Sequence, residues 1–361
     1  MHSLSRGYLD KLRFSASDLK SVQALAEYRG KQALFARQSP QALESLRQIA
    51  MVESGESSNR LEGVTAPRDR ILALVQEDTT PRNRSEQEIV GYRDALNRIH
   101  ANHGRLDFSL DTILQFHVDM TRYTDTPGGR WKDEDNVILE RYADGTPRIR
   151  FRPVSAQETP AAMGRLVEGY EDAIRRDGRE PLVVIPLAIL DFLCIHPFGD
   201  GNGRSSRLLT LLLLYHHGYD VGRYISLERI FEKTKESYYD TLRRCSEGWH
   251  EGTHDAFPWV SYFWGVVLSA YREYEQRVGT IRTGRGAKGD QVRQAVERKL
   301  GAFRSTDIEA ECPGVSHEWV RRILREMRDE GMIEFRGHGP GARWVKLGRQ
   351  APVPEPTSRS D

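Results

Sequence analysis

Two apolar runs, separated by a short glycine-rich segment, constrain the fold of this chain more than any other feature. Residues 182–195 are apolar on nearly every side, and residues 207–217 have the same character. A helix of this composition is stable when it is buried all round, so the two runs predict central helices. Apolar residues also recur at helical spacing over residues 43–50, 89–99 and 113–120, which predicts further helices around them. We therefore expect a mainly α-helical fold.

One stretch departs from the helical pattern. Residues 137–142 and 148–152 are β-prone and flank a turn sequence that contains Asp-Gly-Thr-Pro, which predicts a β-hairpin. Further along, residues 279–289 hold four glycines and few apolar side chains, which predicts a flexible linker. We divide the chain into an N-terminal helical region at 1–100, a core at 101–278, the linker at 279–289, a small domain at 290–348 and a proline-containing disordered tail at 349–361.

The predicted small domain is more basic than the rest of the chain. Residues 282–350 carry 15 Lys and Arg against 10 Asp and Glu, whereas residues 1–281 carry 37 against 40. Three helical segments, the second capped by Ser305 and the third by Ser316, precede two β-prone runs, an order that resembles a winged helix-turn-helix. The third segment and the hairpin carry arginines suited to DNA phosphates: Arg321, Arg322, Arg325, Arg328 and Arg343. Acidic side chains are interspersed among them, so DNA binding and docking to a protein both stay open.

The composition restricts the class of protein further. The 361 residues suggest two or three domains, and 53 Lys and Arg against 52 Asp and Glu give a net charge of +1. No apolar run reaches the ~18 residues of a membrane span, and no secretory signal is visible at the start. The cysteines, at positions 194, 245 and 312, have neither metal-binding nor disulfide spacing. We therefore expect a protein of the reducing cytoplasm without a membrane partner.

The segment between the two apolar runs carries most of the chemistry. It reads His-Pro-Phe-Gly-Asp-Gly-Asn-Gly-Arg-Ser-Ser-Arg from His196 to Arg207, and we expect a loop that enters a helix at Asn202 or Gly203. Free N–H groups at such a helix start form an anion site. Glycines such as Gly201 also let a ligand approach the main chain. The segment therefore predicts binding of an anionic group.

Four side chains of this segment suit the phosphates of a nucleotide. Arg204 and Arg207 are three residues apart on one helix face, and two guanidinium groups match a polyphosphate better than a single carboxylate. Asp200 offers a hard oxygen ligand for Mg²⁺. His196 titrates near neutral pH and could accept a proton from an attacking hydroxyl. Each feature is common alone, but together within twelve residues they favour transfer to or from a nucleotide phosphate.

The same segment resembles the signature of the Fic family, His-x-Phe-x-Asp/Glu-Gly-Asn-Gly-Arg-x-x-Arg, at every fixed position. Most Fic proteins transfer AMP from ATP to a hydroxyl of Tyr, Ser or Thr in a target protein. The resemblance covers roughly residues 40–275 and implies a Fic helical core whose β-hairpin is the flap that holds the target by main-chain pairing. It further implies that His196 is the general base, that Asp200 holds Mg²⁺ and that Phe198 anchors the loop. The other signature residues would bind the ATP phosphates: Gly201, Asn202, Gly203, Arg204 and Arg207.

An upstream hexapeptide, from Ser58 to Gly63, resembles the inhibitory motif of this family, Ser/Thr-x-x-x-Glu-Gly/Asn. Its place before the core resembles the class with an N-terminal inhibitory helix, which we put at about residues 50–63. Glu62 would pair with Arg207 and so remove the cation that should hold the γ-phosphate, leaving the α-phosphate misaligned for attack. An ordinary helix C-terminus would give the same hexapeptide.

Past the signature, Tyr238 and Tyr239 lie in the region where relatives line the adenine pocket, and aromatic rings can stack on a base. We predict a protein adenylyltransferase that uses ATP and Mg²⁺ and is autoinhibited by Glu62. Two alternatives stay open: removal of AMP from a modified protein, with Glu62 directing water, and a nucleotide-sensing DNA-binding regulator. The sequence does not decide the target protein, which could be the chain itself, or whether the chain forms a homodimer.

Overall fold

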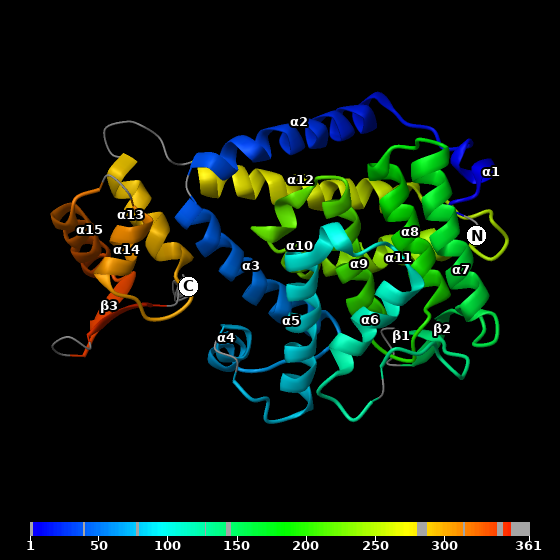
Figure 1. Cartoon of the computed structure of the whole chain (residues 1–361), viewed down its shortest axis with the longest axis horizontal. Helices are drawn as coiled ribbons and strands as arrows, with labels where there is room; N and C mark the ends of the chain where they lie inside the picture. The colour runs from blue at the N-terminus through cyan, green and yellow to red at the C-terminus, as the bar shows by residue number, and fades with distance from the viewer. Residues whose placement is uncertain are drawn as a thin grey trace, which may run out of the picture. The chain divides into compact units, whose positions relative to one another are not determined.

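The computed structural model describes residues 3–38, 40–76, 79–126, 128–141, 146–279, 287–312, 315–337 and 342–347. Parts of three predictions lie outside these residues: the hairpin turn at 142–145, the linker at 280–286 and the tail at 349–361. The chain divides into two compact units, residues 1–37 with 50–274 and residues 38–49 with 275–361. Figure 1 shows that helices dominate the chain, which confirms the predicted mainly α fold.

The first unit contains most of the helices and one hairpin (Figure 1). Helices α3 (Pro40–Leu61) and α12 (Phe257–Gly279) each have residues in both units, and Gln38, the last residue of the helix that precedes α3, also belongs to the second unit. The other elements of the first unit are α1 (Arg6–Leu9), α2 (Ala16–Gln38), α4 (Arg68–Gln76), α5 (Arg84–Asn102), α6 (Leu110–Thr121), β1 (Ile138–Arg141), β2 (Pro147–Phe151), α7 (Thr159–Glu171), α8 (Pro181–Ile195), α9 (Asn202–His216), α10 (Leu227–Lys233) and α11 (Lys235–Ser246), with short helical turns at His103–Arg105, Asp172–Arg176 and Asp220–Arg223.

Helices α8 and α9 form the centre of the first unit, as their apolar sequences predict. Helix α9 packs against α5, α6 and α8, and nearly all of its side chains are buried. Pro186 lies inside α8, where its missing N–H leaves the carbonyl of Leu182 without the usual helical donor. The indole N–H of Trp264 donates to that carbonyl at 2.8 Å. The buried Trp264 of α12 thereby supplies the donor that Pro186 lacks.

Strands β1 and β2 pair antiparallel and confirm the predicted hairpin. Ile138 lies opposite Phe151, and Leu139 lies opposite Ile149, so the register shifts between the first two residues of β1. The outer face of the hairpin is apolar and open: Leu139 is 56% exposed and Ile149 is 46% exposed. The assignment of this hairpin as a target-binding flap stays a prediction.

The second unit contains α13 (Ala287–Arg298), α14 (Ser305–Glu311), α15 (His317–Asp329), β3 (Ile333–Arg336) and β4 (Arg343–Lys346). The two strands pair antiparallel, and the helices close over a core that includes Phe303, Leu324 and Trp344. This order of elements is the predicted one, while the assignment as a winged helix stays a prediction. Ser316 caps α15 as predicted, accepting a hydrogen bond from the N–H of Trp319.

The predicted cap of α14 is wrong by one residue. Ser305 is the first residue of the helix, and Arg304 occupies the N-cap position. The carboxylate of Asp307 accepts the N–H of Arg304 at 2.7 Å, so an acidic residue inside the first turn satisfies the free donor. Elsewhere, the thiols of Cys194, Cys245 and Cys312 are buried. None of the described helices is both long and apolar enough to cross a membrane.

Candidate active site

The loop between α8 and α9 begins in a strained conformation. His196 has a φ of 53° and is the one non-glycine residue with positive φ among those that the structure describes. Two residues that precede the hairpin hold the loop in this shape. Lys132 donates its main-chain N–H to the carbonyl of Pro197 at 2.8 Å and its ammonium to the carbonyl of Ile195 at 3.2 Å. Asn136 donates to the carbonyl of Phe198 at 3.0 Å.

The imidazole of His196 is oriented to act as a base. Its Nδ1 lies 3.2 Å from the carbonyl of Leu193, an acceptor, so Nδ1 carries the proton and Nε2 keeps its lone pair. Burial lowers the pKa of His196 to about 4, and the positive charge of Lys132 acts in the same direction. The ring is therefore neutral at pH 7 and able to accept a proton through Nε2.

Phe198 and Asn202 give the loop its internal structure. Phe198 is fully buried and stacks on His117 at a centroid distance of 3.9 Å, which confirms its predicted anchoring role. Asn202 accepts the N–H of Phe198 at 2.9 Å and donates to its carbonyl at 2.7 Å. The side chain of Asn202 thus braces the turn. Helix α9 begins at Asn202, as predicted, after Gly201, whose φ of +83° favours glycine.

Arg207 and Glu62 meet, as the sequence predicts. Nη2 of Arg207 lies 2.8 Å from Oε1 of Glu62, and its Nε donates to Oγ of Ser58 at 2.8 Å. The Arg207 side chain is 2% exposed, whereas that of Glu62 is 31% exposed. Burial disfavours the charged form of Arg207, but the carboxylate of Glu62 more than offsets this and raises the pKa of Arg207. The guanidinium is therefore charged, and its Nε and Nη2 groups donate to Ser58 and Glu62.

The carboxylate of Glu62 lies directly over the first turn of α9. A Cβ atom on Gly203 would collide with Oε1 of Glu62. The start of this helix is a place where N–H groups attract anions. Glu62 therefore occupies, with its own negative charge, the position that suits a phosphate group.

Several contacts hold the segment that presents Glu62. Helix α3 ends at Leu61, whose carbonyl accepts the hydroxyl of Tyr239 at 3.1 Å. About two turns earlier, Glu53 pairs with Arg229 at 2.8 Å. The buried hydroxyl of Ser54 donates to the carboxylate of Glu228 at 2.7 Å, and the same carboxylate accepts the hydroxyl of Tyr92 at 2.9 Å. Polar side chains thus connect the segment that ends in Glu62 to α5, α10 and α11.

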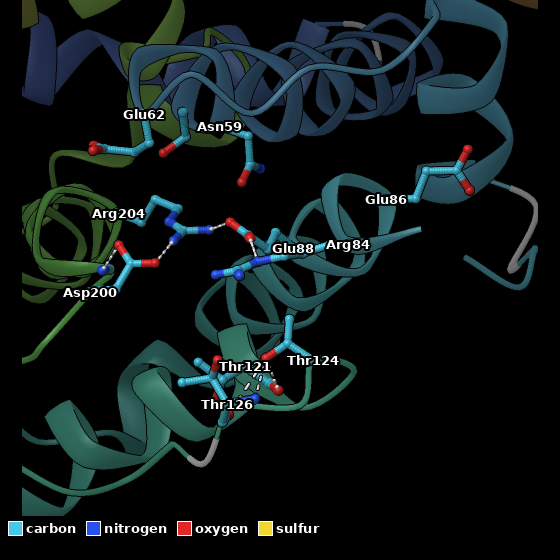
Figure 2. Close-up of polar contacts among 12 residues, drawn as sticks. Asn59, Glu62, Arg84, Glu86, Glu88, Thr121, Thr124, Thr126, Asp200 and Arg204 are labelled. Atoms are coloured by element: carbon cyan, nitrogen blue, oxygen red, sulfur yellow. Dashed lines mark hydrogen bonds and ion pairs between the residues drawn. The ribbon is translucent and has the colours of Figure 1, made fainter. Parts of the chain in front are cut away.

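Arg204 has different partners from Arg207. Figure 2 shows it between two carboxylates, with Nη1 2.6 Å from Glu88 and Nη2 3.3 Å from Asp200. It lines a cavity of about 170 Å³ together with Asp200, Gly201 and residues of α5 and α6. The first two turns of α9 therefore direct Arg204 and Arg207 to different neighbours, although their spacing alone predicts a shared face.

A second cavity, of about 190 Å³, is lined by several of the predicted site residues. It is lined by Glu62, Gly203, Arg207, His196, Tyr238, Tyr239 and apolar residues of α8 and α11. Tyr238 is buried and packs against Phe231 and Trp259, whereas Tyr239 is 45% exposed. Contact of either ring with adenine stays a prediction. The cavity thus places the candidate base His196, the arginine predicted to bind phosphate and the carboxylate of Glu62 around one space.

Asp200 fits the predicted role of a metal ligand. Its carboxylate is 66% exposed, and Oδ1 accepts the N–H of Gly201 at 2.6 Å. No cluster of three or more His, Cys, Asp or Glu groups exists within the described ranges. Mg²⁺ is commonly held by one or two carboxylates with the phosphates of a nucleotide and water. The single exposed carboxylate suits such an ion, with nucleotide and water supplying the other ligands.

The sequence did not predict the residues that form hydrogen bonds or ion pairs with the signature loop and helix α9. Lys132 and Asn136 gave no signal beyond their four-residue spacing, which falls in a stretch without helical pattern. The sequence also gave no sign that Glu88 belongs to the site, because a single acidic residue on a helix forms no motif.

On α15, two of the arginines predicted to contact DNA form ion pairs with nearby carboxylates. Arg322 pairs with Glu326 at 3.0 Å, and Arg328 pairs with Asp329 at 2.8 Å.

A model of the Fic/DOC family matches residues 107–214, which contain α8, the loop and all but the last two residues of α9. A Fido domain-containing protein of Dictyostelium discoideum is 30% identical over 115 residues, which make up 30% of this chain and 78% of that protein. With the fold and the complete signature in place, the chain belongs to the Fic/DOC family.

Longer relatives carry a stated activity. The protein adenylyltransferase fic-1 of Caenorhabditis elegans is 24% identical over 236 residues, or 63% of this chain and 41% of that protein. The chain thus spans less than half the length of that relative. Among solved structures, a Fic family protein from Desulfovibrio desulfuricans has a TM-score of 0.61 at 21% identity and covers 94% of this chain and 98% of its own. That likeness shows a shared fold.

Proposed function

We propose that this protein is an adenylyltransferase that moves AMP from ATP to a hydroxyl side chain of a target protein. The observation that carries the proposal is the cavity in which a neutral His196 faces the first turn of α9 and Arg207. Relatives named protein adenylyltransferases support the choice of nucleotide and of reaction.

The proposed step is an in-line displacement at the α-phosphorus. The target hydroxyl oxygen forms a bond to this phosphorus as the bond to the bridging oxygen of the β-phosphate breaks, and pyrophosphate leaves. Nε2 of His196 takes the hydroxyl proton. The N–H groups at the start of α9 and the guanidinium of Arg207 hold the negative charge of the distal phosphates. Asp200 would hold Mg²⁺, which when bound offsets charge on the phosphates.

The structure also supports autoinhibition as part of the proposal. The Glu62 carboxylate accepts a hydrogen bond from the guanidinium of Arg207 and fills the space over Gly203. ATP that enters this cavity meets a negative charge where its γ-phosphate should bind. The α-phosphate is then held away from in-line geometry, which lowers the rate without preventing binding.

Labelled ATP tests the reaction directly. The Glu62→Gly variant is incubated with ATP labelled at the α-phosphorus and a lysate of the host, and labelled proteins are identified by mass spectrometry. We expect covalent AMP on one or more hydroxyl side chains, and no label when the ATP carries it at the γ-phosphorus. Equal transfer of γ-label would overturn the proposal, because it would indicate a kinase reaction.

One observation favours a second activity at the same site. Glu62 lines the same cavity as His196, and one of its oxygens is bound to Arg207 while the side chain stays 31% exposed. A carboxylate in this position can orient a water molecule towards a phosphodiester, so that AMP is hydrolysed from a modified protein. The wild-type chain would then release AMP from a target labelled by Glu62→Gly, and Glu62→Gly would not. Equal release of AMP by the wild type and by Glu62→Gly would exclude a hydrolysis that depends on Glu62.

A further inference from the structure

A cation on the β-hairpin faces the cavity that contains His196. Arg150 lies on β2 and lines this cavity together with Phe151 and with Ile138 of the opposite strand. The preceding residue, Ile149, points outward and is 46% exposed. Arg150 is therefore presented to the same space as the proposed base.

An irregularity of the hairpin accounts for this orientation. Ile138 pairs with Phe151, but the next residue of β1, Leu139, pairs with Ile149. Arg150 is thus the extra residue of a β-bulge, a feature that re-aims side chains and is common beside active sites. The bulge lets two consecutive residues, Arg150 and Phe151, line one cavity, which a regular strand would not allow.

The carboxylate of Glu140 on β1 acts on Arg150 through space, but the two side chains do not form an ion pair. The guanidinium of Arg150 is partly buried, and no hydrogen bond or ion pair joins it to another residue in the described part of the chain. Burial lowers the pKa of Arg150 below its ordinary value. A partly buried cation without a partner is unfavourable, so an anionic group from a ligand is its natural complement.

The positions of the other cationic groups in the cavity indicate which anionic group of a ligand lies beside Arg150. Arg207, Gly203 and the start of α9 form one wall of the cavity, which the proposed function assigns to the distal phosphates. Arg150 comes from the hairpin wall, and its charge acts on His196 and on Tyr238. The part of a nucleotide that must lie beside His196 in the proposed reaction is the α-phosphate.

We propose that Arg150 binds the α-phosphate of the nucleotide and stabilises the negative charge that develops on its non-bridging oxygens during attack. The inference rests on the proposed function, from which it takes the nucleotide as ligand. Because the hairpin supplies this cation, the strand pair contributes a charged side chain to the reaction as well as a backbone edge.

Binding of AMP and adenosine to the full chain tests this role. Calorimetry is performed on Glu62→Gly and on the same chain with Arg150→Ala, Arg150→Lys or Arg148→Ala. Arg148 is a matched control, because it lies on the same strand, is exposed and does not line the cavity. Since a charge-assisted hydrogen bond contributes roughly 1.5–3 kcal/mol, we expect Arg150→Ala to weaken AMP binding by about 10- to 100-fold. Adenosine binding should be unchanged, and Arg150→Lys should restore part of the AMP affinity.

Other results overturn the assignment. Unchanged AMP affinity would show that Arg150 does not contact the phosphate, and an equal loss of AMP and adenosine would place it at the base or ribose. If Arg150→Ala does not fold, as judged by thermal unfolding, Arg150→Gln is judged by the same AMP-to-adenosine comparison. A chain that binds AMP through Arg150 but transfers no label from ATP would refute the proposed function alone. Normal transfer with unaltered AMP affinity would refute the role of Arg150 alone.

Discussion

The signature loop and the segment that ends in Glu62 line one cavity but are held in place by different contacts. The loop from His196 to Arg207 is fixed by hydrogen bonds within it, such as the two between Asn202 and Phe198, by donors from Lys132 and Asn136, and by the buried ring of Phe198. The segment that ends in Glu62 depends on ion pairs and hydroxyl contacts with other elements. The contacts around Glu62 are thus mainly polar, whereas a buried aromatic ring anchors the loop, so we expect the segment that ends in Glu62 to be the easier of the two to displace.

The largest expected effect comes from a substitution in the signature loop. Replacing His196 by Ala in the Glu62→Gly chain should reduce AMP transfer by about 10²- to 10⁴-fold, the usual contribution of a general base. ATP affinity should stay the same, because the imidazole is not a phosphate ligand. Transfer is measured with α-labelled ATP and affinity by calorimetry. His196→Asn serves as a second variant, because Asn tolerates the positive φ at this position. Undiminished labelling in both variants would contradict the assignment of the base.

The next effect tests the ion pair between Glu62 and Arg207. Glu62→Gly removes the carboxylate from Arg207, and we expect transfer to rise by about 10- to 100-fold, since a charge-assisted hydrogen bond contributes about 1.5–3 kcal/mol. Glu62→Gln keeps the shape without the charge and should give an intermediate rate. Glu56→Gln is the matched control on α3, because Glu56 pairs with Arg60 and Arg68 outside the cavity. Activation by the control as strong as by Glu62→Gly would argue against the ion pair as the inhibitory contact.

A smaller effect should follow from loosening α3 at a distance from the cavity. Arg229 holds Glu53 at 2.8 Å and Glu273 at 2.6 Å, and its side chain is 13% exposed. Arg229→Ala in the otherwise wild-type chain should raise the basal transfer rate by roughly 2- to 5-fold, because partly buried ion pairs contribute on the order of 1 kcal/mol. Arg243→Ala, at an ion pair that is about half exposed, should leave the rate unchanged. Basal transfer that stays at the wild-type rate in Arg229→Ala would show that Glu53 and Arg229 do not support inhibition.

The smallest effect concerns pH. Burial lowers the pKa of His196 to about 4, with Lys132 and Arg150 acting in the same direction and Glu62 against it. The active form is the neutral ring, which predominates above this pKa, so activity is present at high pH and lost as pH falls towards about 4. For Glu62→Gly, kcat/KM for ATP should be nearly level between pH 6 and 8. A half-maximal value near pH 6.5, the ordinary pKa of histidine, would show that the ring is exposed to water in the working enzyme.

By itself the sequence determined the helical core, the hairpin and the loop that enters α9, because hydrophobic periodicity and turn chemistry act over a few residues. It also indicated the pairing of Glu62 with Arg207 through the resemblance of two motifs. The tertiary structure alone decided that Arg204 meets Glu88, that Lys132 and Asn136 brace the loop, and that a bulge turns Arg150 into the cavity. Such pairings join residues far apart in the chain, and many carboxylates and cations have the same local pattern. Which of them meet depends on how the helices pack, and no short stretch of sequence encodes that choice.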